Sequence, residues 1–190
     1  MTCSRSARRG AVVLAALIEM NVRTRTMTCK CVMLLLLWCA SGTHAAATLP
    51  GLVTYVTDGD TLWVQPDAGG TAVKVRLQGL DAPEICQHGG KAARELLTRL
   101  ALNKRVTVQV VSHDQYGRTL AAIAVEGGDV GAQLVRAGQA WSYGWRGRPG
   151  AYAAEEALAR QSRQGVFAAA EPESPRDFRK RHGSCHPERP

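Results

Sequence analysis

The sequence predicts an α+β domain, built as a five-stranded β-barrel with three helices packed against it. Three observations carry this prediction. Short apolar runs alternate with turns between residues 52 and 125, which is the pattern of half-buried strands. A helix-forming segment interrupts those runs between the third and the fourth, and two more helical segments follow the fifth.

The predicted strands mix apolar and polar residues over short runs that turns separate. They cover residues 52–56, 61–65, 72–77, 106–111 and 119–125. The first predicted helix, 91–102, has apolar residues near helical spacing. The second, 130–137, follows Asp129, which can cap it, and stops at Gly138; the third covers 152–164. Five short strands with a helix between the third and the fourth predict an OB-type barrel.

Residues 1–45 have the organisation of a secretory leader. Basic residues precede the apolar run 32–38, which is far shorter than the roughly 20 residues that span a bilayer. Small residues follow, so we expect cleavage after Ala45 and a periplasmic or extracellular protein without stable membrane association. A leader that begins at Met20 or Met27 would have a more usual length, which indicates that the start codon has been placed too early. The alternative is an uncleaved membrane anchor.

Charge and cysteine content divide unevenly along the chain. The leader carries a formal +5 of the total +8, so the predicted domain 46–170 and the basic tail 171–190 together carry only +3. Global charge is therefore weak evidence for a polyanionic partner. Four of six cysteines lie in the leader, and the remaining Cys86 and Cys185 predict one disulfide after export. The tail is typical of a solvated segment; the alternative is a phosphate-contacting arm, tied back if Cys185 bonds Cys86.

Two acidic turns flank the second and third predicted strands. Asp58 and Asp60 lie in the first turn, and Asp81 and Glu84 in the second. Each turn alone is typical of an ordinary hairpin or helix start. Carboxylates from two loops that meet at one end of a barrel can also supply the oxygen ligands of a hard cation such as calcium.

Two arginines give these acids a chemical context. Arg76 lies on the third strand, and Arg118 ends the loop 114–118. An isolated arginine is usually a surface charge, but guanidinium groups also clamp phosphate oxygens in a bidentate way. Metal-assisted phosphodiester cleavage requires acids that bind the cation and act on the attacking water. It also requires cationic donors that stabilise charge on the phosphate, and the two arginines can supply them.

From residue 52 to residue 167 the chain resembles the staphylococcal thermonuclease family. The resemblance rests on the order and spacing of motifs at residues 56–61, 75–77, 79–84, 114–118, 134–138 and 165–167. It implies an OB-fold hydrolase, an endonuclease that cleaves DNA and RNA with calcium, without strong sequence specificity, and leaves 3′-phosphate ends. DNA and RNA are then the expected partners of a monomer with no protein partner.

The resemblance also implies a ligand set and a base. Asp60 and Asp81 would bind calcium through their carboxylates, and Ala82 through its main-chain carbonyl. Glu84 would orient or deprotonate the attacking water.

The remaining implied roles concern the phosphate and the base of the substrate. Arg76 would hold the scissile phosphate, and Arg118 would stabilise the transition state. Tyr116 and Tyr143 would shape the nucleotide pocket, where an aromatic face can stack on any base. For Tyr143 the alternative is packing beneath the third helix.

Two departures from the family pattern affect substrate handling. The loop after the catalytic glutamate is short, with only residues 85–90 before the helix, and Gln115 stands where the founding member has a lysine. The rival to an enzyme is a catalytically inactive OB-fold module that binds nucleic acid or protein. Such modules typically lose the acids or arginines, and this chain has them all.

Overall fold

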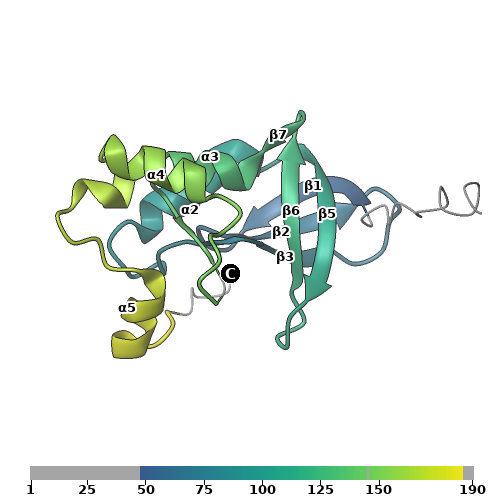
Figure 1. Cartoon of the computed structure of the whole chain (residues 1–190). Helices are drawn as coiled ribbons and strands as arrows, with labels where there is room; N and C mark the ends of the chain where they lie inside the picture. Colours follow the sequence, from purple (N-terminus) through teal and green to yellow (C-terminus); the bar gives the residue numbers. More distant parts are fainter. Residues whose placement is uncertain (1–47, 145, 186–190) are drawn as a thin grey trace, which may run out of the picture. The chain divides into compact units, whose positions relative to one another are not determined.

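The computed structural model describes residues 48–144 and 146–185 (Figure 1). The expected leader, cleavage site and four cysteines of residues 1–45 lie outside these residues. The strands are β1 (Thr48–Val56), β2 (Thr61–Pro66), β3 (Val73–Leu77), β4 (Leu80–Asp81), β5 (Arg105–His113), β6 (Thr119–Val125), β7 (Gly128–Asp129) and β8 (Trp141–Ser142). The helices are α2 (Gly90–Ala101), α3 (Val130–Arg136), α4 (Ala153–Gln161) and α5 (Pro175–His182), with a 3₁₀ turn η1 (Gly165–Ala168).

Five strands close into a barrel, which confirms the predicted α+β class. The sheet runs β3-β2-β1-β5-β6-β7, and a parallel pairing of β3 with β6 joins its two sides. All other ladders of this sheet are antiparallel. Because closure leaves no open edge between β3 and β6, the loops at one end of the barrel are held in fixed relative positions.

The core lies inside the barrel and beneath the helices. Val53, Leu62, Val75 and Ile123 point inward from four different strands, and Leu97 of α2 and Leu134 of α3 join the same buried cluster. Figure 1 shows α2, α3 and α4 gathered beside the barrel, with α5 beyond them. Burying one such side chain stabilises the fold by about 1.5–3 kcal/mol, so the site described below rests on a rigid base.

The predicted helices α2 and α3 are confirmed within a residue. Asp129 caps α3 by accepting a hydrogen bond from the Ala132 amide at 3.1 Å. Gly138 ends it with φ of 66°, and a Cβ there would lie 2.1 Å from the Gln164 carbonyl oxygen, so only glycine fits.

Two expectations were wrong. The helix expected over 152–164 ends at Gln161, because Arg163 has φ of 51° and cannot continue a right-handed helix. Residues 171–185 are not merely a solvated tail, since they contain the fourth helix, α5. Within residues 48–144 and 146–185, no helix is both long enough and apolar enough to cross a membrane.

Candidate active site

The candidate site lies where the β1–β2 turn, β3, β4 and the loop before α2 meet. Thr61 pairs with Arg76 across β2 and β3, and the Leu77 amide donates to the Asp60 carbonyl at 2.8 Å. This pairing places the side chain of Asp60 beside that of Arg76. Asp81 follows on β4, only five positions after Arg76.

Arg76 joins the two aspartates that the sequence nominated as metal ligands. Its Nη1 donates to Asp60 Oδ1, and its Nη2 donates to Asp81 Oδ1 at 2.8 Å. Asp60 Oδ1 also accepts from the Thr61 hydroxyl at 2.9 Å, and Oδ2 accepts from the Ala82 amide at 3.1 Å. Asp60 is 3% exposed and Asp81 is 6% exposed. Buried carboxylates need such partners, so these acids are held in one defined geometry.

Burial also shifts proton affinities in this cluster. Burial, followed by the negative charge of Asp60, raises the pKa of Asp58 to about 7. For Arg76, burial alone would lower the pKa, but Asp60 and Asp81 outweigh it and raise the pKa above its usual value. Arg76 is therefore a permanent cation between two acids.

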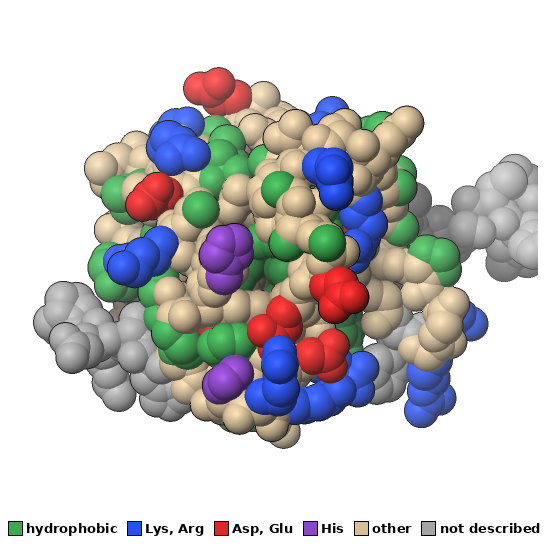
Figure 2. Space-filling view, turned by 90° about the vertical axis from the view of Figure 1, so that its left-hand side faces the viewer, with side chains coloured by type: hydrophobic (Ala, Val, Ile, Leu, Met, Phe, Trp, Pro, Cys, Tyr) green, Lys and Arg blue, Asp and Glu red, His purple; other side chains and the backbone are tan. Residues whose placement is uncertain are grey.

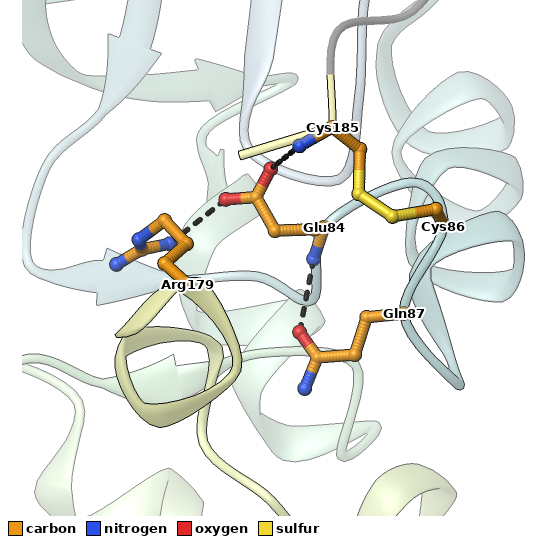
Figure 3. Close-up of a disulfide and its surroundings, with 5 residues drawn as sticks. All are labelled: Glu84, Cys86, Gln87, Arg179 and Cys185. Atoms are coloured by element: carbon orange, nitrogen blue, oxygen red, sulfur yellow. Dashed lines mark hydrogen bonds and ion pairs between the residues drawn. A yellow bond between two sulfur atoms is a disulfide. The ribbon is translucent and has the colours of Figure 1, made fainter. Parts of the chain in front are cut away.

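Glu84 points from the loop before α2 toward the C-terminal segment, as Figure 3 shows. Its Oε1 accepts from Arg179 Nη1 at 3.0 Å, and its Oε2 accepts from the Cys185 amide at 3.3 Å. The Glu84 amide in turn donates to Gln87 Oε1 at 3.1 Å. Arg179 also binds Asp81 through both terminal nitrogens, at 3.2 and 2.7 Å. The hydrogen bonds that Arg179 donates to Asp81 are the main reason that the pKa of Arg179 is raised.

Arg179 belongs to this cluster but was not among the site residues predicted from the sequence. Two signals in the sequence could have found it. One is the cysteine pair, which ties residue 185 to the loop that carries Glu84. The other is the cluster of arginines and a lysine in the same tail.

Arg118 stands apart from this cluster, in the loop between β5 and β6. Its Nε donates to Asp114 Oδ2 at 2.7 Å, and its guanidinium carbon lies 5.4 Å from the centre of the Tyr116 ring. Asp114 Oδ1 accepts from the Tyr116 and Arg118 amides, which fixes the turn. Slight burial acts to raise the pKa of Asp114, but these hydrogen bonds lower it. Within the described residues, no hydrogen bond or ion pair joins Arg118 to Asp60, Asp81 or Glu84.

The two nominated tyrosines are accessible to a ligand. Tyr116 is 74% exposed and Tyr143 is 50% exposed. Tyr143 does not pack beneath α4; Trp141 is buried there instead, edge-on to Phe167 with ring centres 5.3 Å apart. Both tyrosine rings could therefore contact a base.

The donor set fits calcium in its chemistry. Two carboxylates and a main-chain carbonyl, from Asp60, Asp81 and Ala82, are hard oxygen ligands of the kind calcium prefers. In this structure Asp60 Oδ1 and both carboxylate oxygens of Asp81 accept hydrogen bonds from guanidinium groups, and Asp60 Oδ2 accepts one from the Ala82 amide. Within residues 48–144 and 146–185, no group of three or more His, Cys, Asp or Glu side chains is arranged to hold a metal ion. A cation would thus share Asp81 with Arg76 and Arg179 or displace one of their contacts.

Comparison with known proteins adds independent evidence. The sequence model of a family described as staphylococcal nuclease homologue matches residues 74–169. The chain is 35% identical over 136 residues to an uncharacterized endonuclease of Escherichia coli O157:H7, which covers 71% of this chain and 88% of that protein. It is also 35% identical over 127 residues to the probable staphylococcal-like nuclease CAN1 of Oryza sativa subsp. japonica, covering 63% of this chain and 38% of that protein.

Proposed function

The chain belongs to the staphylococcal nuclease homologue family, and from this premise we propose that it is a calcium-dependent nuclease. Its substrates would be the phosphodiester bonds of DNA and RNA, cleaved without strong sequence specificity. The observation that carries the proposal is the buried cluster in which Arg76 bridges Asp60 and Asp81, with Glu84 beside it. An inactive binding module would have no need to keep these acids buried together.

The acids divide into two roles. Asp60, Asp81 and the Ala82 carbonyl would hold the cation, because two of these three groups carry charge and all present oxygen. Calcium bound there would supply positive charge to the scissile phosphate. Glu84 would take a proton from the attacking water, since its side chain is more exposed than those of Asp60 and Asp81.

The cationic and aromatic residues would handle the substrate itself. Arg76 would bind the scissile phosphate, and Arg118, from the loop between β5 and β6, would stabilise the charge that develops on it. The exposed faces of Tyr116 and Tyr143 would stack on bases regardless of their identity, which fits a nuclease without sequence preference.

Digestion assays test the proposal directly. Plasmid DNA and a long RNA are incubated with the protein in calcium and in excess chelator, and we expect cleavage only with calcium. Asp60→Asn should lower the apparent calcium affinity, so that activity requires a higher calcium concentration, because the change removes a negative charge that offsets dehydration of the cation. Glu84→Gln should lower turnover about a hundred- to ten-thousand-fold at saturating calcium, as loss of a general base does.

Matched control variants, and the results that would contradict the proposal, test the roles of Asp60 and Glu84. Asp67→Asn and Glu95→Gln make the same chemical changes outside the cluster and should behave like the parent. Cleavage that continues unchanged in chelator would refute calcium dependence. If Asp60→Asn binds calcium like the parent, or Glu84→Gln keeps near-parental turnover, the division between metal ligand and base is wrong.

A further inference from the structure

We propose that Arg179 on α5 is a positioning residue of the active site, which holds Asp81 and Glu84 in their reactive arrangement. The Cys86–Cys185 disulfide fastens it there. This inference rests on the nuclease function proposed above and adds to it a residue and an element that the family comparison does not reach, because the match to the family ends at residue 169.

Arg179 contacts two acids with different proposed roles, the metal ligand Asp81 and the base Glu84. Its Nη2 lies 2.7 Å from Asp81 Oδ2, and its Nη1 lies 3.2 Å from Asp81 Oδ1 and 3.0 Å from Glu84 Oε1. One planar guanidinium thus binds a nominated metal ligand in a bidentate way and also reaches the nominated base. Arginine suits this task because its donors are fixed in one plane. Without it, two neighbouring carboxylates would repel each other and move apart.

The segment that carries Arg179 is tied to the Glu84 loop at both ends of α5. Before the helix, Gln87 Nε2 donates to the Glu173 carbonyl at 2.9 Å. After it, Cys185 is bonded to Cys86, two residues from Glu84, and its amide donates to Glu84 Oε2 (Figure 3). Each carboxylate oxygen of Glu84 is therefore held by the C-terminal segment.

Helix α5 is itself well defined. Ser174 caps it by accepting from the Asp177 amide at 3.2 Å, and Pro175 occupies its first turn. Two of its other cations bind elsewhere: Lys180 pairs with Asp177, and Arg181 pairs with Glu173. Figure 2 shows this mixture of acidic and basic side chains on the face where α5 lies. A catalytic geometry is most reliably held by a side chain on such a rigid element.

Two observations indicate that Arg179 positions the acids and does not block the site. Asp60, Asp81 and Glu84 outnumber Arg76 and Arg179, so the cluster remains net negative and still attracts a cation. The Glu84 backbone also packs closely against α2, because a Cβ at Gly90 would lie 1.9 Å from the Glu84 carbonyl oxygen. Glu84 is thus held by α2 through its backbone and by α5 through its side chain, as orientation for catalysis requires.

Steady-state kinetics of Arg179→Gln, Arg179→Lys and the control Arg176→Gln test the proposal. Arg176 is exposed on the same helix and has the same charge. Among the residues that the structure describes, no hydrogen bond or ion pair joins it to Asp81 or Glu84. For Arg179→Gln we expect kcat to fall about 10- to 100-fold with KM within about 3-fold of the parent, because orientation is lost and not substrate affinity. Arg179→Lys should recover part of that loss, and Arg176→Gln should match the parent.

Calcium binding and reduction supply two further measurements. Calcium alone, titrated calorimetrically, should bind Arg179→Gln at least as tightly as the parent, because a cation beside Asp81 has been removed. Thermal melting followed by circular dichroism shows whether each variant folds. If Arg179 variants do not fold, reduction of the parental disulfide replaces them, and kcat should fall in the same direction as α5 detaches.

The outcomes separate this proposal from the proposed function. A parent without calcium-dependent cleavage overturns the nuclease function itself, and no variant is needed to see it. With an active parent, Arg179→Gln turnover equal to or above the parent would overturn the positioning role and make α5 an inhibitory cover. A raised KM with unchanged kcat would overturn it in favour of substrate binding. Parental turnover after complete reduction would overturn the fastening by the disulfide.

Discussion

Arg76 and Arg118 are the same residue type placed for different tasks. Arg76 is committed on both terminal nitrogens to Asp60 and Asp81, whereas Arg118 is held through Nε by Asp114 of its own loop. The Nε contact orients the guanidinium plane, and within the described residues its terminal nitrogens make no hydrogen bond. The terminal nitrogens of Arg118 are therefore available to the charge that would develop on a phosphate, whereas Arg76 would bind a phosphate while it also contacts its two acids.

Replacing Arg118 by lysine should lower turnover by about a hundredfold or more. The charge is kept, but the planar pair of donors that would meet the transition state is lost. Steady-state kinetics on DNA should show a smaller change in KM. Arg105→Lys, which alters an exposed arginine paired with Asp67, is the control. A loss of affinity with no loss of turnover would assign Arg118 to ground-state binding.

A further prediction concerns Gly90, which packs against the backbone of Glu84. Gly90→Ala places a Cβ 1.9 Å from the Glu84 carbonyl oxygen and 2.7 Å from its carbon, so the loop or α2 must shift. We expect a loss of stability of about 1–3 kcal/mol, typical of overpacking, and lower turnover because Glu84 is displaced. Denaturant unfolding and kinetics measure the two effects. In the control Gly128→Ala, the new Cβ lies 3.3 Å from the end of the flexible Gln133 side chain and 3.4 Å from the Val125 carbonyl oxygen, so far less must shift. Equal effects in both variants would contradict the argument.

At the scale of elements, the sequence predicted what periodicity and capping encode. The five barrel strands, α2 and α3 have apolar positions at regular spacing because each buries one face in the core. Strands β4, β7 and β8 are two residues long, so no period could show them. The sequence predicted that the two acidic loops meet at one end of a barrel. It did not predict the pairing of β2 with β3, which places Asp60 beside Arg76.

Helix α5 was missed for a physical reason. Within it only Pro175 is buried, so it has no apolar stripe to recognise. Ion pairs hold it in place, and these join residues up to 98 positions apart, as Arg179 and Asp81 are. The local signal was present in Ser174, Pro175 and Asp177, which form a helix start. What the sequence could not show was which acids its arginine would meet.

The prediction for α5 concerns the disulfide that fastens it. Cys86 and Cys185 are bonded across 99 positions, and closing so long a loop stabilises the folded chain by about 4–5 kcal/mol in the chain-entropy model. The double variant Cys86→Ser, Cys185→Ser should lose stability in that direction, measured by denaturant unfolding. It avoids the unpaired thiol of either single variant. Thiol titration of the exported, denatured and unreduced protein is the direct check, and two reactive thiols per chain would refute the bond.

At the scale of the whole molecule, the charge that matters is local. Only +3 of the formal +8 lies in residues 46–190, so binding of a polyanion would depend on a few placed cations and not on a general field. The family match covers residues 74–169, which leaves Asp60 before it and Arg179 after it. The cluster is assembled from three separate parts of the chain, and closure of the barrel and the disulfide bring them together.

Export is the remaining prediction, and we propose that the mature protein begins near Ala46. The apolar run 32–38 is followed by small residues at the distance that signal peptidase needs, and the disulfide between Cys86 and Cys185 fits an oxidising compartment. The intact mass of the protein recovered from outside the cytoplasm should therefore correspond to a chain that starts within two residues of Ala46. Ala45→Leu should slow cleavage, because the bulky side chain occupies a position that requires a small one. A product that keeps residues 32–38 and sediments with membranes would show that the segment is an anchor, and export as a free protein would then be wrong.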